Sequence, residues 1–185
     1  MNSNRTRIIA LNGLFIALCY IGTMFNITFN FGGAKTMIHF GNVFCLLGAL
    51  VLGGVNGGIA ASIGMGLFDL TNGWVPYAPS TFILKFVIAL IAGTCFTKLK
   101  IANERLKVVV SCASGMLFNF VFSPIASFLT SHFILNVPKE AATIFAGYAS
   151  IAVVVNAIMA TIIASILYFF LAPALKKINL KLQSN

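Results

Sequence analysis

The stretch "FDLTNGWVPYAPSTFILKFVIALIAG", residues 68–93, joins two apolar runs through a short segment rich in aromatic residues and proline. Asp69 stands near the end of the first run, and Lys85 stands inside the second. A charged side chain inside a membrane costs on the order of 3 kcal/mol unless it is paired or hydrated. A hairpin between the two runs brings both residues to a similar depth. We therefore expect either an ion pair that fixes helix packing or the polar floor of a ligand cavity.

The composition places these runs in a membrane. The chain has 185 residues, of which 59% are hydrophobic and 8% are charged, whereas a soluble domain carries about 25% charged residues. Such a chain has too little polar surface to cover a water-facing globule, so we expect an integral membrane protein. The net charge of +9 does not indicate a nucleic-acid partner, because the basic residues lie in short gaps between apolar runs.

Six apolar segments follow one another along the chain. The longest are able to cross a hydrocarbon core of about 30 Å at the helical rise of about 1.5 Å per residue. We therefore expect a single all-α integral membrane domain, residues 1–185, with six transmembrane helices. Their expected ranges are roughly 7–26, 38–54, 57–72, 81–97, 108–130 and 145–172.

The distribution of lysine and arginine predicts the orientation in the membrane, because short cytoplasmic segments carry an excess of these residues. With the N-terminus inside, the cytoplasmic side holds Arg5, Arg7, Lys98, Lys100, Arg105, Lys107, Lys176, Lys177 and Lys181. The outer side holds Lys35 and Lys139. Both termini are therefore expected to be cytoplasmic. The outer loops, 27–37, 73–80 and 131–144, are the longer ones, which favours the capture of something from outside.

The outer loop at 73–80 contains two flat side chains on a stiff backbone. Pro76 and Pro79 stiffen the loop, and Trp74 and Tyr77 supply apolar faces with a polar edge. Trp74 alone is typical of the aromatic belt at a membrane surface. Together with the acid and the lysine of the same stretch, the aromatics favour a lid over buried polar groups. That arrangement suits a small heteroaromatic ligand.

Three further polar residues lie in apolar surroundings. Asn119 and Asn156 fall near the middle of expected helices, and His39 opens the second expected helix. An intramembrane asparagine commonly forms a hydrogen bond between helices, and it is also able to bind a ligand, so both roles stay open. Neither histidine has neighbours at metal-ligand spacing, and the four cysteines form no CxxC pair. No metal and no cofactor are expected.

The first apolar segment carries small residues on one side, at Ala10, Gly13 and Ala17. Small side chains allow another helix to approach closely, which drives helix association within a membrane. The segment is therefore a candidate contact surface for a helical partner protein.

The sequence lacks the equipment of an enzyme. It contains no Walker A pattern, so the chain does not hydrolyse ATP by itself. Its acids are Asp69, Glu104 and Glu140, which are too few and too scattered for acid–base catalysis. We expect no enzymatic activity.

Residues 39–93 carry the most specific pattern in the chain. The pattern begins with "HFG", passes through the glycine-rich turn "LGGVNGG" at 52–58, and reaches an aspartate ahead of "APSTFILK" at 78–85. An N-terminal helix bearing "ALNGLFIA" accompanies it. With these motifs the chain resembles the substrate-binding S component of an energy-coupling factor (ECF) vitamin transporter, in the riboflavin-transporter-like branch.

The resemblance implies a multi-pass subunit of a bacterial plasma membrane that captures a vitamin near the outer surface. Its partners are then a transmembrane coupling subunit (the T component) and two separate ATPase subunits. In this family the first helix contacts the coupling subunit through an AxxxA motif. In this chain the motif is shifted, so that Gly13 and Ala17 form the pair.

The residues bear on which vitamin is captured. The single tryptophan disfavours thiamine, and the scarcity of cations near the expected cavity disfavours a polyanion such as folate. A pyridoxine-type (B6) vitamer or a hydroxymethylpyrimidine is expected first, and riboflavin second because of the branch. The alternatives are a self-sufficient secondary transporter or channel, and a membrane scaffold protein without a ligand.

Overall fold

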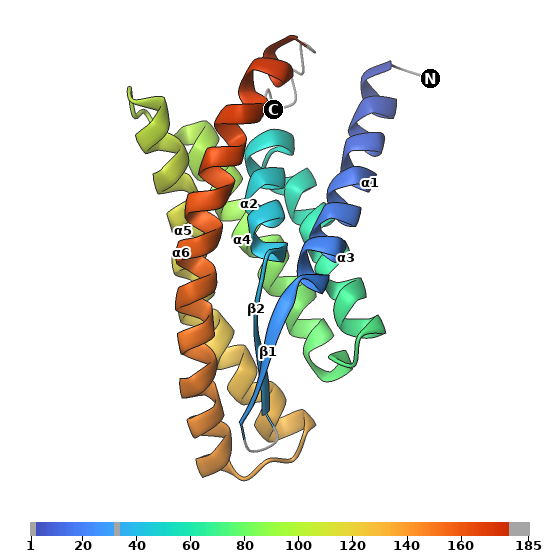
Figure 1. The fold of residues 1–185 in the computed structure, drawn as a ribbon, viewed down its shortest axis with the longest axis vertical. Coiled ribbons are helices and arrows are strands. Elements are labelled where there is room, and N and C mark those ends of the chain that lie inside the picture. The colour runs from blue at the N-terminus through green and yellow to red at the C-terminus, as the bar shows by residue number, and fades with distance from the viewer. Residues whose placement is uncertain (1–2, 32–33, 178–185) are drawn as a thin grey trace.

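Helices make up most of the structure, a computed structural model that describes residues 3–31 and 34–177 (Figure 1). The α-helices are α1 (Ser3–Met24), α2 (Gly41–Leu52), α3 (Gly54–Thr71), α4 (Ala78–Lys98), α5 (Glu104–Leu129) and α6 (Lys139–Lys177). A 3-10 turn, η1 (Val75–Tyr77), precedes α4, and a π-helical turn, η2 (Thr130–Ile134), follows α5. Two strands, β1 (Asn26–Phe31) and β2 (Ala34–His39), lie between α1 and α2.

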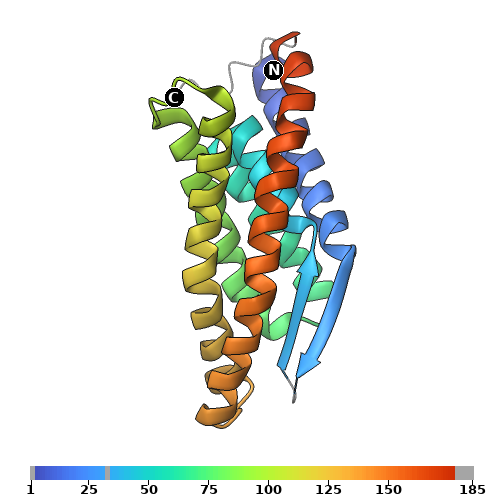
Figure 2. The ribbon, with the colours of Figure 1, turned by 60° about the vertical axis from the view of Figure 1, so that its left-hand side comes forward.

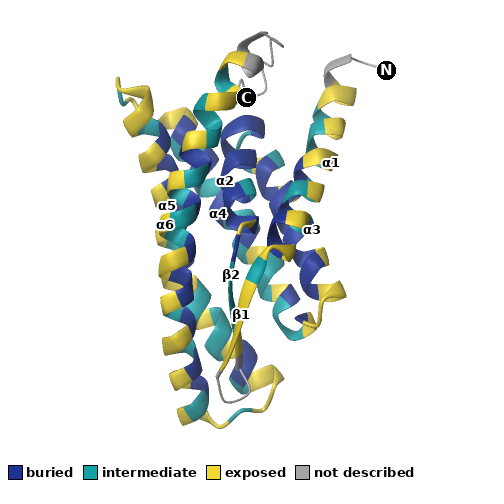
Figure 3. Cartoon of the chain, viewed as in Figure 1, coloured by how far each residue is buried: buried dark blue, intermediate teal, exposed yellow. Residues whose placement is uncertain are grey.

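In the described part of the chain, four helical segments are long and apolar enough to cross a membrane: Arg5–Met24, Val75–Lys98, Glu104–Ile134 and Lys139–Pro173. The α2 helix is apolar but has only 12 residues, fewer than the roughly 20 that a span requires. It packs against α1, α3, α4 and α6, and nearly all of its residues are buried (Figure 3). The fold is therefore that of a helical membrane protein in which α2 is a central helix.

The expected loop at 27–37 is instead a β-hairpin. Strands β1 and β2 pair in antiparallel fashion from Asn26 opposite His39 to Phe31 opposite Ala34. Ile27 and Phe29 alternate with the polar Thr28 and Asn30, which is the period of a strand. This signal is short, and it is overshadowed by the long apolar run before it. Figure 2 shows the hairpin running alongside α6.

The second helix begins at Gly41, and not at residue 38 as expected, because strand β2 continues to His39. The His39 ring caps the start of the helix, because the backbone N–H of Gly41 donates to its Nδ1 over 3.1 Å. That N–H is one of the first-turn donors that lack a partner within the helix. The Phe40 N–H donates to the carbonyl of Gly22 over 3.0 Å, which ties this corner to α1.

A single residue, Gly53, separates α2 from α3, so the turn expected at 52–58 is even tighter. Its φ of +82° lies in the left-handed region that favours glycine. Behind this turn α4 crosses closely: a Cβ on Gly93 would meet the backbone nitrogen of Gly54. Glycine at these positions allows α2, α3 and α4 to pack backbone against backbone.

The two other expected outer loops are shorter in the structure. The α4 helix begins at Ala78, because Pro79 falls in its first turn, where a missing N–H costs nothing. The segment expected as a loop at 131–144 is partly helical, since η2 occupies Thr130–Ile134 and α6 starts at Lys139.

The described ends of the chain lie at the same end of the bundle (Figure 1). The link between α4 and α5 lies at that end too, while the hairpin and the link between α5 and α6 extend toward the opposite end. The basic residues of α1 and of the α4–α5 link therefore gather at one end. Lys181 lies outside the described residues.

Candidate functional site

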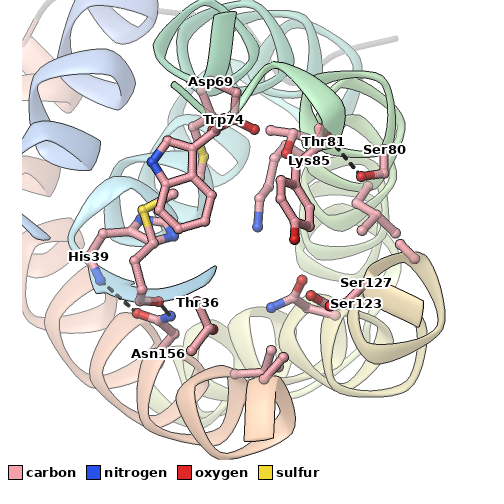
Figure 4. Close-up of a pocket in the computed structure, with 18 of the residues that line it drawn as sticks. Thr36, His39, Asp69, Trp74, Ser80, Thr81, Lys85, Ser123, Ser127 and Asn156 are labelled. Carbon is pink, nitrogen blue, oxygen red and sulfur yellow. Dashed lines mark hydrogen bonds between the residues drawn. The ribbon is translucent and has the colours of Figure 1, made fainter. Parts of the chain in front are cut away.

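One cavity of about 120 Å³ lies between the hairpin, α2, α3, η1, α4, α5 and α6 (Figure 4). All seven residues that the sequence proposed for a binding site line it, namely His39, Asp69, Trp74, Tyr77, Lys85, Asn119 and Asn156. The chain therefore brings its few intramembrane polar groups to a single place. Figure 4 shows the Lys85 side chain reaching toward the open centre, with His39 and Trp74 on the other side.

The Lys85 amine is held by an asparagine. Its Nζ donates to the Oδ1 of Asn42 over 3.0 Å, and the side chain is only 8% exposed. Because α4 begins at Ala78, Lys85 lies about two helical turns from the helix start. The expected helix start at residue 81 placed it about one turn from the start. An ammonium group has three donors, and Asn42 takes one of them. The amine is thus anchored to α2 while it faces the cavity.

Asp69 occupies the same cavity without forming a salt bridge to Lys85. No ion pair within 4.0 Å joins them in the described part of the chain, although their opposite charges attract over a longer distance. The Asp69 carboxylate interacts with the Thr81 side chain of α4, and the residue is 3% exposed. Of the two arrangements that the sequence left open, the direct ion pair is not formed, and each residue makes a separate polar contact at the cavity.

The aromatic pair lies at the end of α3 and covers one side of the cavity. The backbone N–H of Trp74 donates to the backbone carbonyl of Asp69 over 3.0 Å. The backbone N–H of Tyr77 donates to the carbonyl of Trp74 over 2.8 Å. The two rings meet edge to face, with centroids 5.8 Å apart. The Nζ of Lys35, on strand β2, lies 5.9 Å from the centroid of the Trp74 ring, a cation–π distance.

Within residues 3–31 and 34–177, two buried polar atoms of the cavity have no hydrogen-bond partner. They are the hydroxyl of Tyr77 and the Oδ1 of Asn119. Leaving such a group without a partner costs about 1–3 kcal/mol, so folded proteins seldom do so. Both residues line the same space. The Tyr77 hydroxyl can donate or accept a hydrogen bond, and the Asn119 Oδ1 can accept one. A polar molecule bound in the cavity would satisfy both groups.

The amide of Asn156 bonds to the backbone of strand β2. Its Oδ1 accepts from the His39 N–H over 3.0 Å, and its Nδ2 donates to the carbonyl of Met37 over 2.9 Å. The neighbouring His39 ring has a defined tautomer when neutral: because Nδ1 accepts from the Gly41 N–H, the proton resides on Nε2. His39 thus has a donor left for the cavity that it lines.

Comparison with known protein families shows what kind of protein this is. The family model described as ECF-type riboflavin transporter, S component, matches residues 3–173. The chain belongs to this family. It is therefore the substrate-binding subunit of a vitamin transporter in a membrane, and it is not an enzyme. No curated protein and no solved structure matches the chain.

Several residues that line the cavity of this S component were missed by sequence reasoning. Thr81 belongs to the quoted motif but was given no role, and Lys35 was assigned to an outer loop without a role in the site. On α5, Ser123 and Ser127 line the cavity with Asn119, and the spacing of four residues places all three on one helix face. That polar stripe in an apolar helix is the signal by which they could have been found.

The small residues of the first helix lie away from the cavity of this S component. Ala10, Gly13 and Ala17 are exposed on α1, and a Cβ added to Gly13 would meet nothing within 4 Å. The face they form is smooth and is not covered by any described part of the chain.

Proposed function

We propose that this S component captures a small heteroaromatic vitamin in the cavity between the hairpin and α2–α6. The observation that carries the proposal is the meeting of unsatisfied polar groups at one place. The Lys85 amine has donors left over, and the Tyr77 hydroxyl and the Asn119 Oδ1 have no partner. A ligand with both acceptors and donors on its ring would satisfy all three.

Each wall of the cavity then has a role in binding. Lys85 and the Nε2–H of His39 donate to acceptor atoms of the ligand, while Asn119 accepts from a ligand N–H or O–H. Trp74 and Tyr77 supply apolar faces that cover the ring. Asp69 balances the charge of Lys85 and offers a further acceptor. Asn156 contributes through strand β2, to which both groups of its amide bond.

The lining of the cavity bears on the identity of the vitamin. One carboxylate faces two amines, those of Lys85 and Lys35, which disfavours a cationic ring and favours one that is neutral, zwitterionic or rich in acceptors. We infer that a pyridoxine-type vitamer or a hydroxymethylpyrimidine is the substrate. Riboflavin is the second candidate, and the description of the matching family supports it.

We further infer the orientation and the partners of the subunit. The charge pattern supports cytoplasmic termini, which puts the hairpin and the aromatic pair on the outer side of a plasma membrane. The exposed face at Ala10, Gly13 and Ala17 is then available to a coupling subunit. Two ATPase subunits bound to that partner would supply the energy for uptake.

Thermal unfolding of the purified protein with single vitamins tests the proposal. A ligand that binds the native state alone raises the unfolding midpoint, by an amount that grows with the ratio of its concentration to its Kd. We expect pyridoxine, hydroxymethylpyrimidine or riboflavin to raise the midpoint and thiamine to leave it unchanged. A flat response to all of them would sink the proposal and favour a scaffold without a ligand. Uptake by reconstituted vesicles that lack any ATPase would instead point to a self-sufficient transporter.

A further inference from the structure

The two-stranded hairpin has one edge that β1 does not cover. Strand β2 pairs with β1 from His39 to Ala34, and in a two-stranded sheet alternate residues direct their N–H and C=O groups away from the partner strand. The His39 N–H and the Met37 C=O are two such groups. Unpaired backbone groups on a strand edge within or near a membrane are costly.

Asn156 of α6 covers this edge as a neighbouring strand would. Its carboxamide has an acceptor oxygen and an NH2 donor group, and both bond to the edge, at 3.0 Å from the His39 N–H and at 2.9 Å to the Met37 carbonyl. The residue is 4% exposed, so water does not compete for these bonds. It lies 117 and 119 positions from its partners in the sequence. Two hydrogen bonds from one buried side chain therefore tie the hairpin to the helix that it packs against.

The same strand forms one wall of the cavity. Thr36, Met37 and His39 line it, and Figure 4 shows Asn156 bonded to the strand at the cavity margin. A hairpin of two strands is marginally stable by itself. Its position against α6, and with it the shape of the cavity, depends on what fastens the outer edge of β2.

Asn119 provides the internal comparison. It is also a buried asparagine that lines the cavity, yet its Oδ1 has no partner, whereas the amide of Asn156 is engaged at both ends. The two asparagines are similarly buried but differ in their bonds. The acceptor of Asn119 is free for a ligand, whereas the amide of Asn156 bonds to the protein backbone.

We propose that Asn156 is a positioning residue that fastens the hairpin over the cavity, so that a bound vitamin is retained through the hairpin and not through a direct bond to Asn156. The retention of a vitamin rests on the proposed function, whereas the fastening of the hairpin does not. Loss of these two hydrogen bonds loosens β2 against α6, which lets the ligand leave faster.

A distance measured across the empty protein tests the fastening without any ligand. Spin labels are attached to Asn30→Cys on the exposed face of β1 and to Gly13→Cys on α1, where an added side chain meets nothing. The half-buried Cys95 is replaced by serine, and the other three cysteines are buried. Pulsed electron paramagnetic resonance then compares Asn156→Ala and Asn156→Asp with Asn119→Ala. The aspartate keeps the volume of the side chain but places an oxygen against the Met37 carbonyl.

We expect a broader distribution with a longer mean distance in both Asn156 variants, and the parental distribution in Asn119→Ala. In a second measurement, pyridoxine or riboflavin should dissociate about tenfold faster from Asn156→Ala. Parental distances in both Asn156 variants, or equal broadening in Asn119→Ala, would overturn the inference. If neither these two vitamins nor hydroxymethylpyrimidine binds the parent protein, the proposed function fails, while the distances still decide the role of Asn156.

Discussion

The Lys85 amine and the Asn42 Oδ1 are joined by a 3.0 Å hydrogen bond at the base of the cavity. Asn42 belongs to the buried α2 helix, and Lys85 belongs to α4. A neutral acceptor orients the ammonium group but does not cancel its charge, as the carboxylate of Asp69 would in a salt bridge. The charge therefore remains available to an acceptor that enters the cavity.

This pairing predicts that the contributions of Asn42 and Lys85 to stability are coupled. Asn42→Ala removes the acceptor of a buried cation, which we expect to cost about 1.5–3 kcal/mol. In a Lys85→Met background the same change removes a polar group that has already lost its partner, so the loss should be small. Thermal unfolding of the four proteins of this cycle measures the coupling. An equal loss in both backgrounds would contradict the pairing.

Tyr77→Phe should separate binding from stability. The Tyr77 hydroxyl has no hydrogen-bond partner among the described residues, so its removal should leave the unfolding temperature unchanged or raise it. Binding of the vitamin should weaken about 3- to 10-fold, because one hydrogen bond contributes about 0.5–1.5 kcal/mol. Calorimetric titration measures the affinity.

Tyr20→Phe is the matched control for that change. The Tyr20 hydroxyl is hydrogen-bonded to Thr71 over 3.0 Å and lies outside the cavity. We expect it to leave the affinity unchanged. If Tyr77→Phe lowers stability and spares binding, the hydroxyl is not part of a ligand site.

The close crossing of α4 over the α2–α3 turn predicts a sharp difference between two glycines. Gly93→Ala would press a methyl group against the backbone of Gly54, and overpacking of this kind costs about 1–3 kcal/mol. Gly13→Ala meets no neighbour and should stabilise α1 by up to about 1 kcal/mol. Unfolding midpoints in detergent check both. A Gly93→Ala protein as stable as the parent would show that the helices are not in backbone contact there.

Lys85→Met should weaken binding of the vitamin by about tenfold or more, on the order of 1.4 kcal/mol, because it removes the charged donor of the cavity. Lys98→Met is the control, since Lys98 stands in the last turn of the same helix and is exposed. Both variants are titrated with pyridoxine and riboflavin. An equal loss of affinity in the two variants would show that the effect comes from net charge and not from the cavity.

The sequence was informative where polar residues are rare. An acid, a lysine and two asparagines inside apolar runs each carry an energetic cost, and this marked Asp69, Lys85, Asn119 and Asn156 as residues that line one cavity. The helices were visible for the same reason, because long apolar runs leave few alternatives in a membrane.

The features that could not be predicted from the sequence depend on contacts between residues that are far apart in the chain. The hairpin at 26–39 is short, and it is fastened by Asn156, more than one hundred residues away. The choice of Asn42 over Asp69 as the partner of Lys85 is likewise a matter of how α2 and α4 pack. Periodicity along the chain carries no record of either contact.

Mass spectrometry of the small molecules released from the purified protein tests the central claim most directly. Protein produced in rich medium and then denatured should release one heteroaromatic vitamin in an amount close to that of the protein. Lys85→Met protein of equal purity should release far less of it. The absence of any such compound from the parent protein, or equal amounts from both, would contradict the assignment of the cavity as a vitamin site.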